Sequence, residues 1–127
     1  MAGRPGRRAV ADPLGKLREI CLALPDVVEG EAWGHPVWRV GKSLFAGYGL
    51  QGRWCVNVKL EEPHADLLRN DPRLVSTTLW GRNRWVSLEA AKIEEWAEIA
   101  DMVLEGYRMS AGKRSLAKLG DRRGQKE

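Results

Sequence analysis

Cysteine and histidine are scarce in this sequence, which limits the metal chemistry that it can support. The 127 residues include two cysteines, Cys21 and Cys55, and two histidines, His35 and His64. No two of these four lie within five positions of each other, so the short ligand spacing of a zinc knuckle is absent. Two cysteines are also too few for a disulfide framework. We therefore expect no metal, no cofactor, reduced thiols and a cytoplasmic protein.

Long apolar runs are missing as well. No stretch approaches the roughly 18 consecutive apolar residues that a transmembrane helix needs. The basic N-terminal residues are not followed by the apolar segment of a secretory signal. We expect neither a membrane segment nor a cleaved leader, and the chain length fits a single domain.

Motifs of catalysis and phosphate binding are absent too. The sequence contains no Gly-x-Ser-x-Gly nucleophile elbow, no Walker loop and no Gly-x-Gly-x-x-Gly turn that opens a helix. Its paired carboxylates, such as Glu61 and Glu62, are adjacent rather than convergent, which is typical of a helix surface. These absences predict a binding protein rather than an enzyme.

Hydrophobic periodicity and turn residues predict an α+β order. Apolar residues at helical spacing predict helices at 12–24, 61–70 and 90–110. β-branched and aromatic residues predict a meander of strands within 27–60, at 37–40, 43–48 and 54–58, and two further strands at 74–80 and 85–88. The turns within the meander are too short for parallel crossovers. We predict one α+β domain, with an antiparallel sheet of about five to six strands and helices packed on one face.

Acidic residues are missing from two of the predicted strand regions. The net charge is +4, of which residues 1–11 carry +3 and residues 112–127 carry +4, so that the body from 12 to 111 is negative. We expect these two basic ends to be tails outside the domain. Within the body, residues 32–60 and 73–88 contain basic side chains and no acid, while residues 89–105 are strongly acidic. A basic sheet surface facing away from acidic helices is one interpretation, and solvated faces without function are the other.

The strongest local signal is the segment from Trp80 to Trp85. Arg82, Asn83 and Arg84 lie between two predicted strands, with a tryptophan on each arm. Arginine binds phosphates through two parallel hydrogen bonds, and asparagine can hydrogen-bond a base edge. Such a basic loop is typical of a DNA-binding wing. The alternative is a hairpin whose tryptophans pack together while its arginines are merely exposed.

Other aromatic residues accompany basic ones in the strand region. Trp33, His35 and Arg39 can hold a small anionic ligand against an indole wall, or His35 can make a structural hydrogen bond at a strand bend. Trp33, Trp38 and Trp54 can stack unpaired bases, or they can be buried.

Several of these residues together resemble the MmcQ/YjbR family of small bacterial proteins. The resemblance rests on Arg18 to Pro25, on Trp33 to Val40 with Gly41-Lys42 and Phe45-Ala46 following, and on Gly81 to Leu88. It implies an α+β fold of the YjbR/CyaY-like kind and DNA binding through a double-wing arrangement. The similarly folded frataxin proteins bind iron through an acidic first helix, whereas the first predicted helix here offers only Asp12 and Glu19 against Lys16 and Arg18, which disfavours iron binding. The family-like positions are Trp33, Gly34, His35, Pro36, Arg39, Lys42, Phe45, Lys59 and Trp85.

Three functional hypotheses follow. The first is non-enzymatic binding of nucleic acid, in particular double-stranded DNA, by Arg82, Asn83 and Arg84, with phosphate contacts from Arg39, Lys42, Arg53 and Lys59. The second is a protein-interaction module of the adaptor or chaperone kind. The third is a binder of a small anion at Trp33, His35 and Arg39. We expect a monomer, whereas a dimer would favour the second hypothesis.

Overall fold

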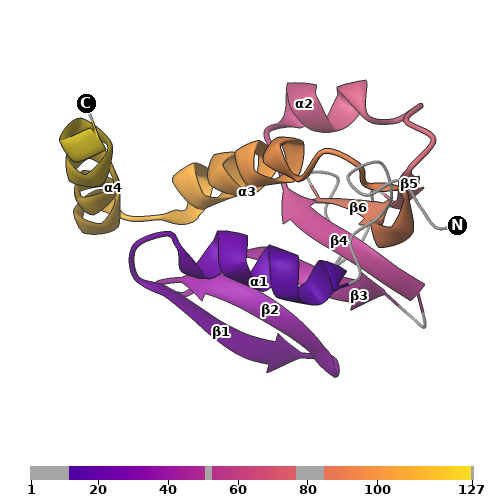
Figure 1. The fold of residues 1–127 in the computed structure, drawn as a ribbon, viewed down its shortest axis with the longest axis horizontal. Coiled ribbons are helices and arrows are strands. Elements are labelled where there is room, and N and C mark those ends of the chain that lie inside the picture. Colours follow the sequence, from indigo (N-terminus) through magenta and orange to yellow (C-terminus); the bar gives the residue numbers. More distant parts are fainter. Residues whose placement is uncertain (1–11, 51–52, 77–84, 127) are drawn as a thin grey trace, which may run out of the picture.

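An antiparallel sheet with helices on one side makes up the body of the protein (Figure 1). The structure, a computed structural model, describes residues 12–50, 53–76 and 85–126. Its elements are α1 (Pro13–Leu22), β1 (Val27–Ala32), β2 (His35–Val40), β3 (Ser43–Leu50), β4 (Arg53–Lys59), α2 (Glu62–Leu67), β5 (Leu74–Ser76), β6 (Trp85–Glu89), the 3₁₀ turn η2 (Ala90–Lys92), α3 (Trp96–Ser110) and α4 (Lys113–Lys126). The predicted α+β class with an antiparallel sheet is confirmed.

The first helix forms where its capping residues predict. The Asp12 carboxylate accepts a hydrogen bond from the N–H of Gly15 at 2.9 Å. Pro13 occupies the first turn, where a backbone donor is not needed. Leu17 and Cys21 are fully buried, and both belong to the main hydrophobic core.

In the part of the chain that the structure describes, no helix is long and apolar enough to span a bilayer.

The sheet divides its side chains between two faces. The six strands lie in the order β1-β2-β3-β4-β6-β5, and each neighbouring pair is antiparallel. Because successive side chains point to opposite sides, Trp38 and Val56 join the core under the helices, while Val37 and Asn57 point the other way. We call these sides the helix face and the second face. By pairing and alternation the second face carries Val28, His35, Val37, Arg39, Leu44, Gly47, Cys55, Asn57, Lys59, Trp85 and Ser87.

Packing between α3 and the helix face holds the core together. The rings of Phe45 and Tyr107 meet edge to face, with centroids 5.6 Å apart, and both are fully buried. The Tyr107 hydroxyl donates to the carbonyl of Pro25 at 2.7 Å and so ties α3 to the segment between α1 and β1. A Cβ at Gly106 would lie 2.6 Å from the carbonyl oxygen of Lys59, so glycine permits the close approach of α3 to β4.

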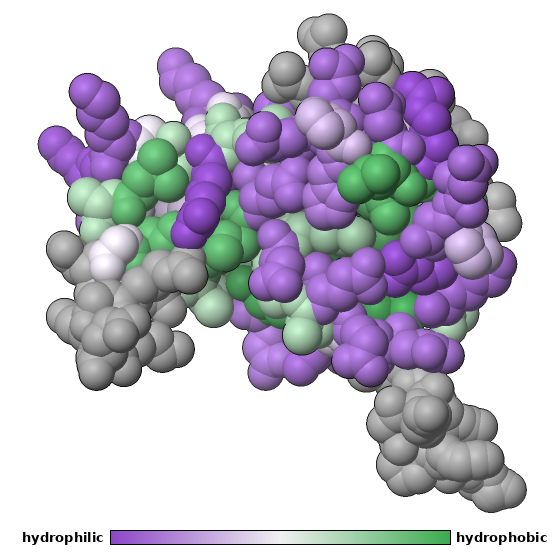
Figure 2. Space-filling model, turned by 90° about the horizontal axis from the view of Figure 1, so that it is seen from above, coloured by the Kyte–Doolittle hydropathy of each residue, from purple (hydrophilic) through white to green (hydrophobic). Residues whose placement is uncertain are grey.

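Two segments differ from the predicted elements. The helix expected over 90–110 begins only at Trp96, because Ile93 is extended and fully buried. Its apolar side chain fits the helical spacing although it does not lie on the helix. The basic segment expected as a tail from 112 contains α4, in which Leu119 is buried against the core. Seen from above (Figure 2), hydrophobic side chains are visible at the left and in a second patch at the right that hydrophilic side chains surround.

Candidate functional site

A row of small and polar residues crosses the middle of the second face. Val37 pairs with Gly47, Gly47 with Asn57, and Asn57 with Ser87. All four residues are buried, yet none belongs to the core cluster under the helices. The second face therefore has a buried strip of its own, and this strip is largely polar.

Two polar atoms of this strip have no hydrogen-bond partner. The amide Nδ2 of Asn57 donates to the carbonyl of Gly49 at 2.8 Å. The other amide atom, Asn57 Oδ1, and the neighbouring hydroxyl Ser87 Oγ make no hydrogen bond, although both residues are fully buried. Most buried polar groups form hydrogen bonds. Asn57 Oδ1 and Ser87 Oγ, which belong to one cross-strand pair, can therefore each form a further hydrogen bond.

Cations gather at one end of the second face, which we call the basic end and define by Arg39, Lys42 and Lys59. Arg39 lies near the end of β2, Lys42 in the turn that follows, and Lys59 at the end of β4. Since β2 and β4 flank β3 and run the same way, Arg39 and Lys59 lie roughly 10 Å apart across the sheet. Among the described residues, none of the three cations has an acidic side chain at ion-pair distance.

Two arginines on the helix side of the sheet, Arg18 and Arg73, are paired instead. Arg18 on α1 donates to both carboxylate oxygens of Glu29, at 2.8 and 2.9 Å, and this hydrogen bonding lowers the pKa of Glu29. Arg73 binds Asp71 and Glu98, each at 2.8 Å. Its hydrogen bonds lower the pKa of both carboxyl groups. The positive charge of these arginines is therefore already neutralised, in contrast to that of the basic end.

The predicted wing cannot be placed in the same way. Arg82, Asn83 and Arg84 lie outside the described residues, as does the side chain of Arg53. Trp85, the first residue of β6, is buried and pairs with Lys59. The described chain therefore resumes after the predicted wing at the basic end.

The predicted small-anion pocket is spread along one strand. Trp33 and Gly34 form the two-residue turn between β1 and β2, with φ values of 52° and 80°. His35 packs against Gly49, since a Cβ there would lie 2.5 Å from His35 Nδ1. His35 and Arg39 share the second face but stand four residues apart on β2, roughly 13 Å. This separation does not favour one small anion bound by both.

The tryptophans divide into buried and exposed ones. Trp38 is fully buried and donates its indole N–H to Glu29 at 3.1 Å, so the hypothesis that it stacks on bases is wrong. Trp33 is 70% exposed and Trp54 is 67% exposed. The ring of Trp54 stacks on Tyr48, with centroids 5.9 Å apart and planes 15° from parallel.

Sequence reasoning missed a half-buried histidine–carboxylate pair between α2 and α3. His64 Nδ1 lies 2.7 Å from Glu105 Oε1, and Glu105 Oε2 accepts a hydrogen bond from the backbone N–H of Glu61 at 2.7 Å. The two partners are 41 residues apart, so no local pattern indicates their contact. The pair fastens the start of α2 to α3.

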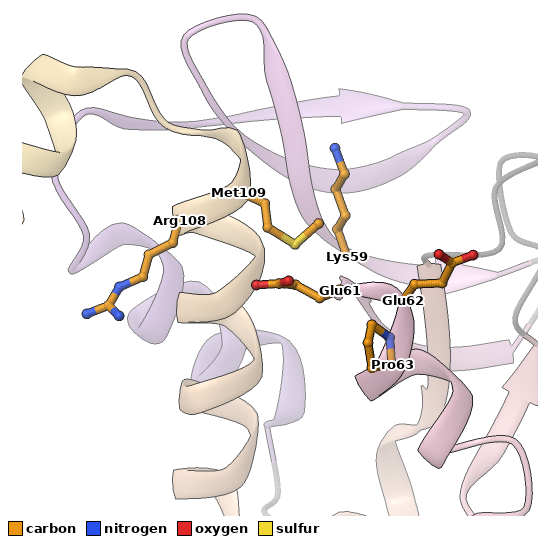
Figure 3. A pocket seen from close by; sticks show the side chains of 6 residues that line it. All are labelled: Lys59, Glu61, Glu62, Pro63, Arg108 and Met109. Atoms are coloured by element: carbon orange, nitrogen blue, oxygen red, sulfur yellow. The ribbon is translucent and has the colours of Figure 1, made fainter.

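A cleft beside this pair, of about 520 Å³, is lined by Lys59, Glu61, Glu62, Pro63, Arg108 and Met109. Figure 3 shows that its charged groups diverge: the Lys59 amine and the Arg108 guanidinium point in different directions. The cleft therefore presents no set of convergent groups. In the described ranges, no three histidine, cysteine or acidic side chains form a group that could hold a metal ion. Cys21 and Cys55 are both buried, and burial raises the pKa of the Cys21 thiol.

A protein-family model described as YjbR matches residues 22–109. No curated protein matches the chain. The matched range begins within α1 and ends within α3, so it includes the whole sheet and leaves out α4.

Proposed function

The chain belongs to the YjbR family, and from this premise and the charges of the sheet we propose that it binds nucleic acid without catalysing a reaction. The basic end is the core of the proposed contact, with Arg82, Asn83, Arg84 and Arg53 as additional contacts. The proposed ligand is double-stranded DNA, bound mainly through its phosphates and with little sequence preference.

The observation that carries this proposal is that three neighbouring cations at the basic end have no ion pair within the described part of the chain, in contrast to Arg18 and Arg73. Arg39, Lys42 and Lys59 have no acidic partner among the described residues, whereas Arg18 and Arg73 are held by carboxylates. An unpaired cation can exchange its counterions for a phosphate without first breaking an ion pair. The basic end is therefore better suited to a polyanion than Arg18 and Arg73 are.

A salt series tests the proposal directly. Binding of a labelled random-sequence DNA duplex is followed by fluorescence polarisation for the wild type and for the triple variant Arg39→Gln, Lys42→Gln, Lys59→Gln. Each phosphate contact contributes about 0.9 to the slope of log affinity against log salt. We expect the variant to bind more weakly and its slope to flatten by roughly 2.7.

The matched control removes the same charge elsewhere. Lys16, Arg69 and Lys92 form ion pairs with acids three residues away on the helix side. The triple variant Lys16→Gln, Arg69→Gln, Lys92→Gln should leave affinity and slope close to those of the wild type. Equal losses in the two triple variants would show that net charge alone drives binding, and would overturn the assignment to the basic end.

The predicted wing is tested separately. Replacing Arg82 and Arg84 with Ala should flatten the slope by roughly 1.8 if both contact phosphates. An unchanged slope would remove the wing from the proposal and leave the basic end standing. The cytoplasmic location and the monomeric state stay predictions.

A further inference from the structure

We propose that α4 is a second phosphate-binding element, fixed by Asp26 beside the basic end, and this inference rests on the proposed function. The helix lies in the segment that the sequence predicts to be a loose basic tail. Its contacts with the body distinguish a positioned element from such a tail.

Asp26 is the polar anchor of α4. Its Oδ2 accepts a hydrogen bond from the Ser115 hydroxyl at 2.6 Å, and its Oδ1 accepts one from the Lys118 amine at 2.9 Å. These two hydrogen bonds lower the pKa of Asp26, Ser115 contributing most. Asp26 itself has a φ of 64°, in the left-handed region that a non-glycine residue seldom adopts. This backbone geometry directs one carboxylate toward two residues of the same helix.

Apolar contacts hold α4 from the other side. Leu119 is 8% exposed and belongs to the main core, and Leu116 and Ala111 pack against that core. The Tyr107 hydroxyl also donates a hydrogen bond to the carbonyl of Pro25, the residue before Asp26. The segment between α1 and β1 is thus bound by α3 and by α4, so the first half of α4 has a defined place on the body.

This place adjoins the basic end. Asp26 directly precedes Val27, which pairs with Val40, and Val40 pairs with Ser43 across the turn that contains Lys42. The anchor of α4 therefore lies at the end of the sheet that carries Arg39 and Lys42. Figure 1 shows α4 beyond the end of α3, next to the segment that joins α1 to β1.

The charge on α4 suits phosphate. Lys113 and Arg114 are exposed and have no acid at ion-pair distance among the described residues. A helix that carries these two cations and is held at a fixed position loses less conformational freedom on binding than a mobile tail with the same charge. We therefore infer one continuous phosphate-binding surface from the basic end to α4.

The test asks whether Asp26→Gly weakens or strengthens DNA binding, because a positioned α4 and attraction by charge alone predict opposite results. Asp26→Gly removes both anchoring contacts, and glycine adopts the positive φ without strain. The substitution also removes a negative charge, so attraction by charge alone predicts unchanged or tighter DNA binding. A positioned α4 predicts the opposite, and we expect roughly fivefold weaker binding of the duplex by the full chain.

Two further variants complete the experiment. Ser115→Ala removes one anchoring hydrogen bond without changing any charge, and should weaken binding by a smaller factor than Asp26→Gly. Asp66→Asn removes one negative charge on α2, where Asp66 pairs with Arg69, and serves as the charge control. Trypsin digestion monitors docking, since the backbone of a docked helix is cleaved more slowly after its lysines and arginines than that of a released one.

The outcomes separate the two proposals. Binding by Asp26→Gly that is as tight as that by Asp66→Asn, with the wild type still dependent on Arg39, Lys42 and Lys59, would overturn the role of α4 alone. Faster tryptic cleavage at α4 without any loss of affinity would overturn it equally. No binding by the wild type would overturn the proposed function, and with it this inference.

Discussion

Two arginines on the helix side of the sheet form ion pairs that the cations of the basic end do not form with any described residue. On the helix side, Arg18 and Arg73 form ion pairs with carboxylates at 2.8 Å, and these ion pairs join elements that are distant in the sequence. At the basic end, Arg39 and Lys59 have no such partner among the described residues. The same residue type therefore serves structure on one side and is left available on the other. The net charge of the whole chain, +4, therefore indicates less about where an anion could bind than the ion pairing of each cation does.

The two faces also differ in how they are buried. The helix face packs apolar side chains such as Phe45 and Val58 under α1 and α3. The second face buries Asn57 and Ser87, with two polar atoms left unpaired. Stability should therefore depend mainly on apolar volume at the helix face, and on polar pairing at the second face.

The largest effect is expected from loss of apolar volume at the helix face. Phe45→Ala should lower the free energy of unfolding by about 3–5 kcal/mol, because it removes a fully buried ring and leaves a cavity beside Tyr107. Urea denaturation followed by tryptophan fluorescence measures this loss. The control is Val28→Ala on the second face, where the side chain is 62% exposed and the change should stay within about 0.5 kcal/mol. Similar losses at both positions would contradict the assignment of the core.

A smaller, pH-dependent effect is expected at Arg73. The paired Asp71 and Glu98 have pKa values lowered by hydrogen bonds from Arg73. Carboxyl groups with lowered folded-state pKa values stabilise the fold above their unfolded pKa values near 4, and this stability is lost as the pH falls through the lowered values. Since Glu98 is 41% exposed, we expect Arg73→Met to cost roughly 1–2 kcal/mol at pH 7.

The difference between wild type and Arg73→Met should then shrink as the pH falls below about 4. Thermal unfolding at a series of pH values from 7 to about 3 measures it. Lys92→Gln, which removes an exposed cation paired with Glu89 at 3.7 Å, is the matched control and should show little pH-dependent change. A difference that stays constant across the range would mean that Arg73 stabilises by packing alone.

Local signals predicted much of the fold. Asp12 and Pro13 mark the start of α1, and the β-branched and aromatic residues from Val37 to Val40 predict β2. The sequence failed where long-range contacts decide. Ile93 has the spacing of a helical residue but is extended, and α4 is docked by Asp26, which lies 89 residues from Ser115.

The candidate site was predictable in composition but not in geometry. The absence of acids from residues 32–60 indicates a basic surface, and Arg39, Lys42 and Lys59 do lie at one end of the sheet. Their proximity depends on strand register, which sequence alone does not give. The same register separates His35 from Arg39, and so disfavours the small pocket that their closeness in sequence suggested.

The smallest effect, and the one of opposite sign, is expected in the polar row of the second face. Ser87 is fully buried and its hydroxyl has no hydrogen-bond partner, so the folded state bears a desolvation cost that water relieves in the unfolded state. Ser87→Ala should therefore raise the free energy of unfolding, by about 0.5–1 kcal/mol in urea denaturation. Ser110→Ala is the parallel case: its hydroxyl, at the end of α3, is also buried and unpaired, so this substitution should raise the free energy of unfolding too. A loss of stability in Ser87→Ala would instead mean that the Ser87 hydroxyl has a hydrogen-bond partner in the folded protein, such as an ordered water shared with Asn57.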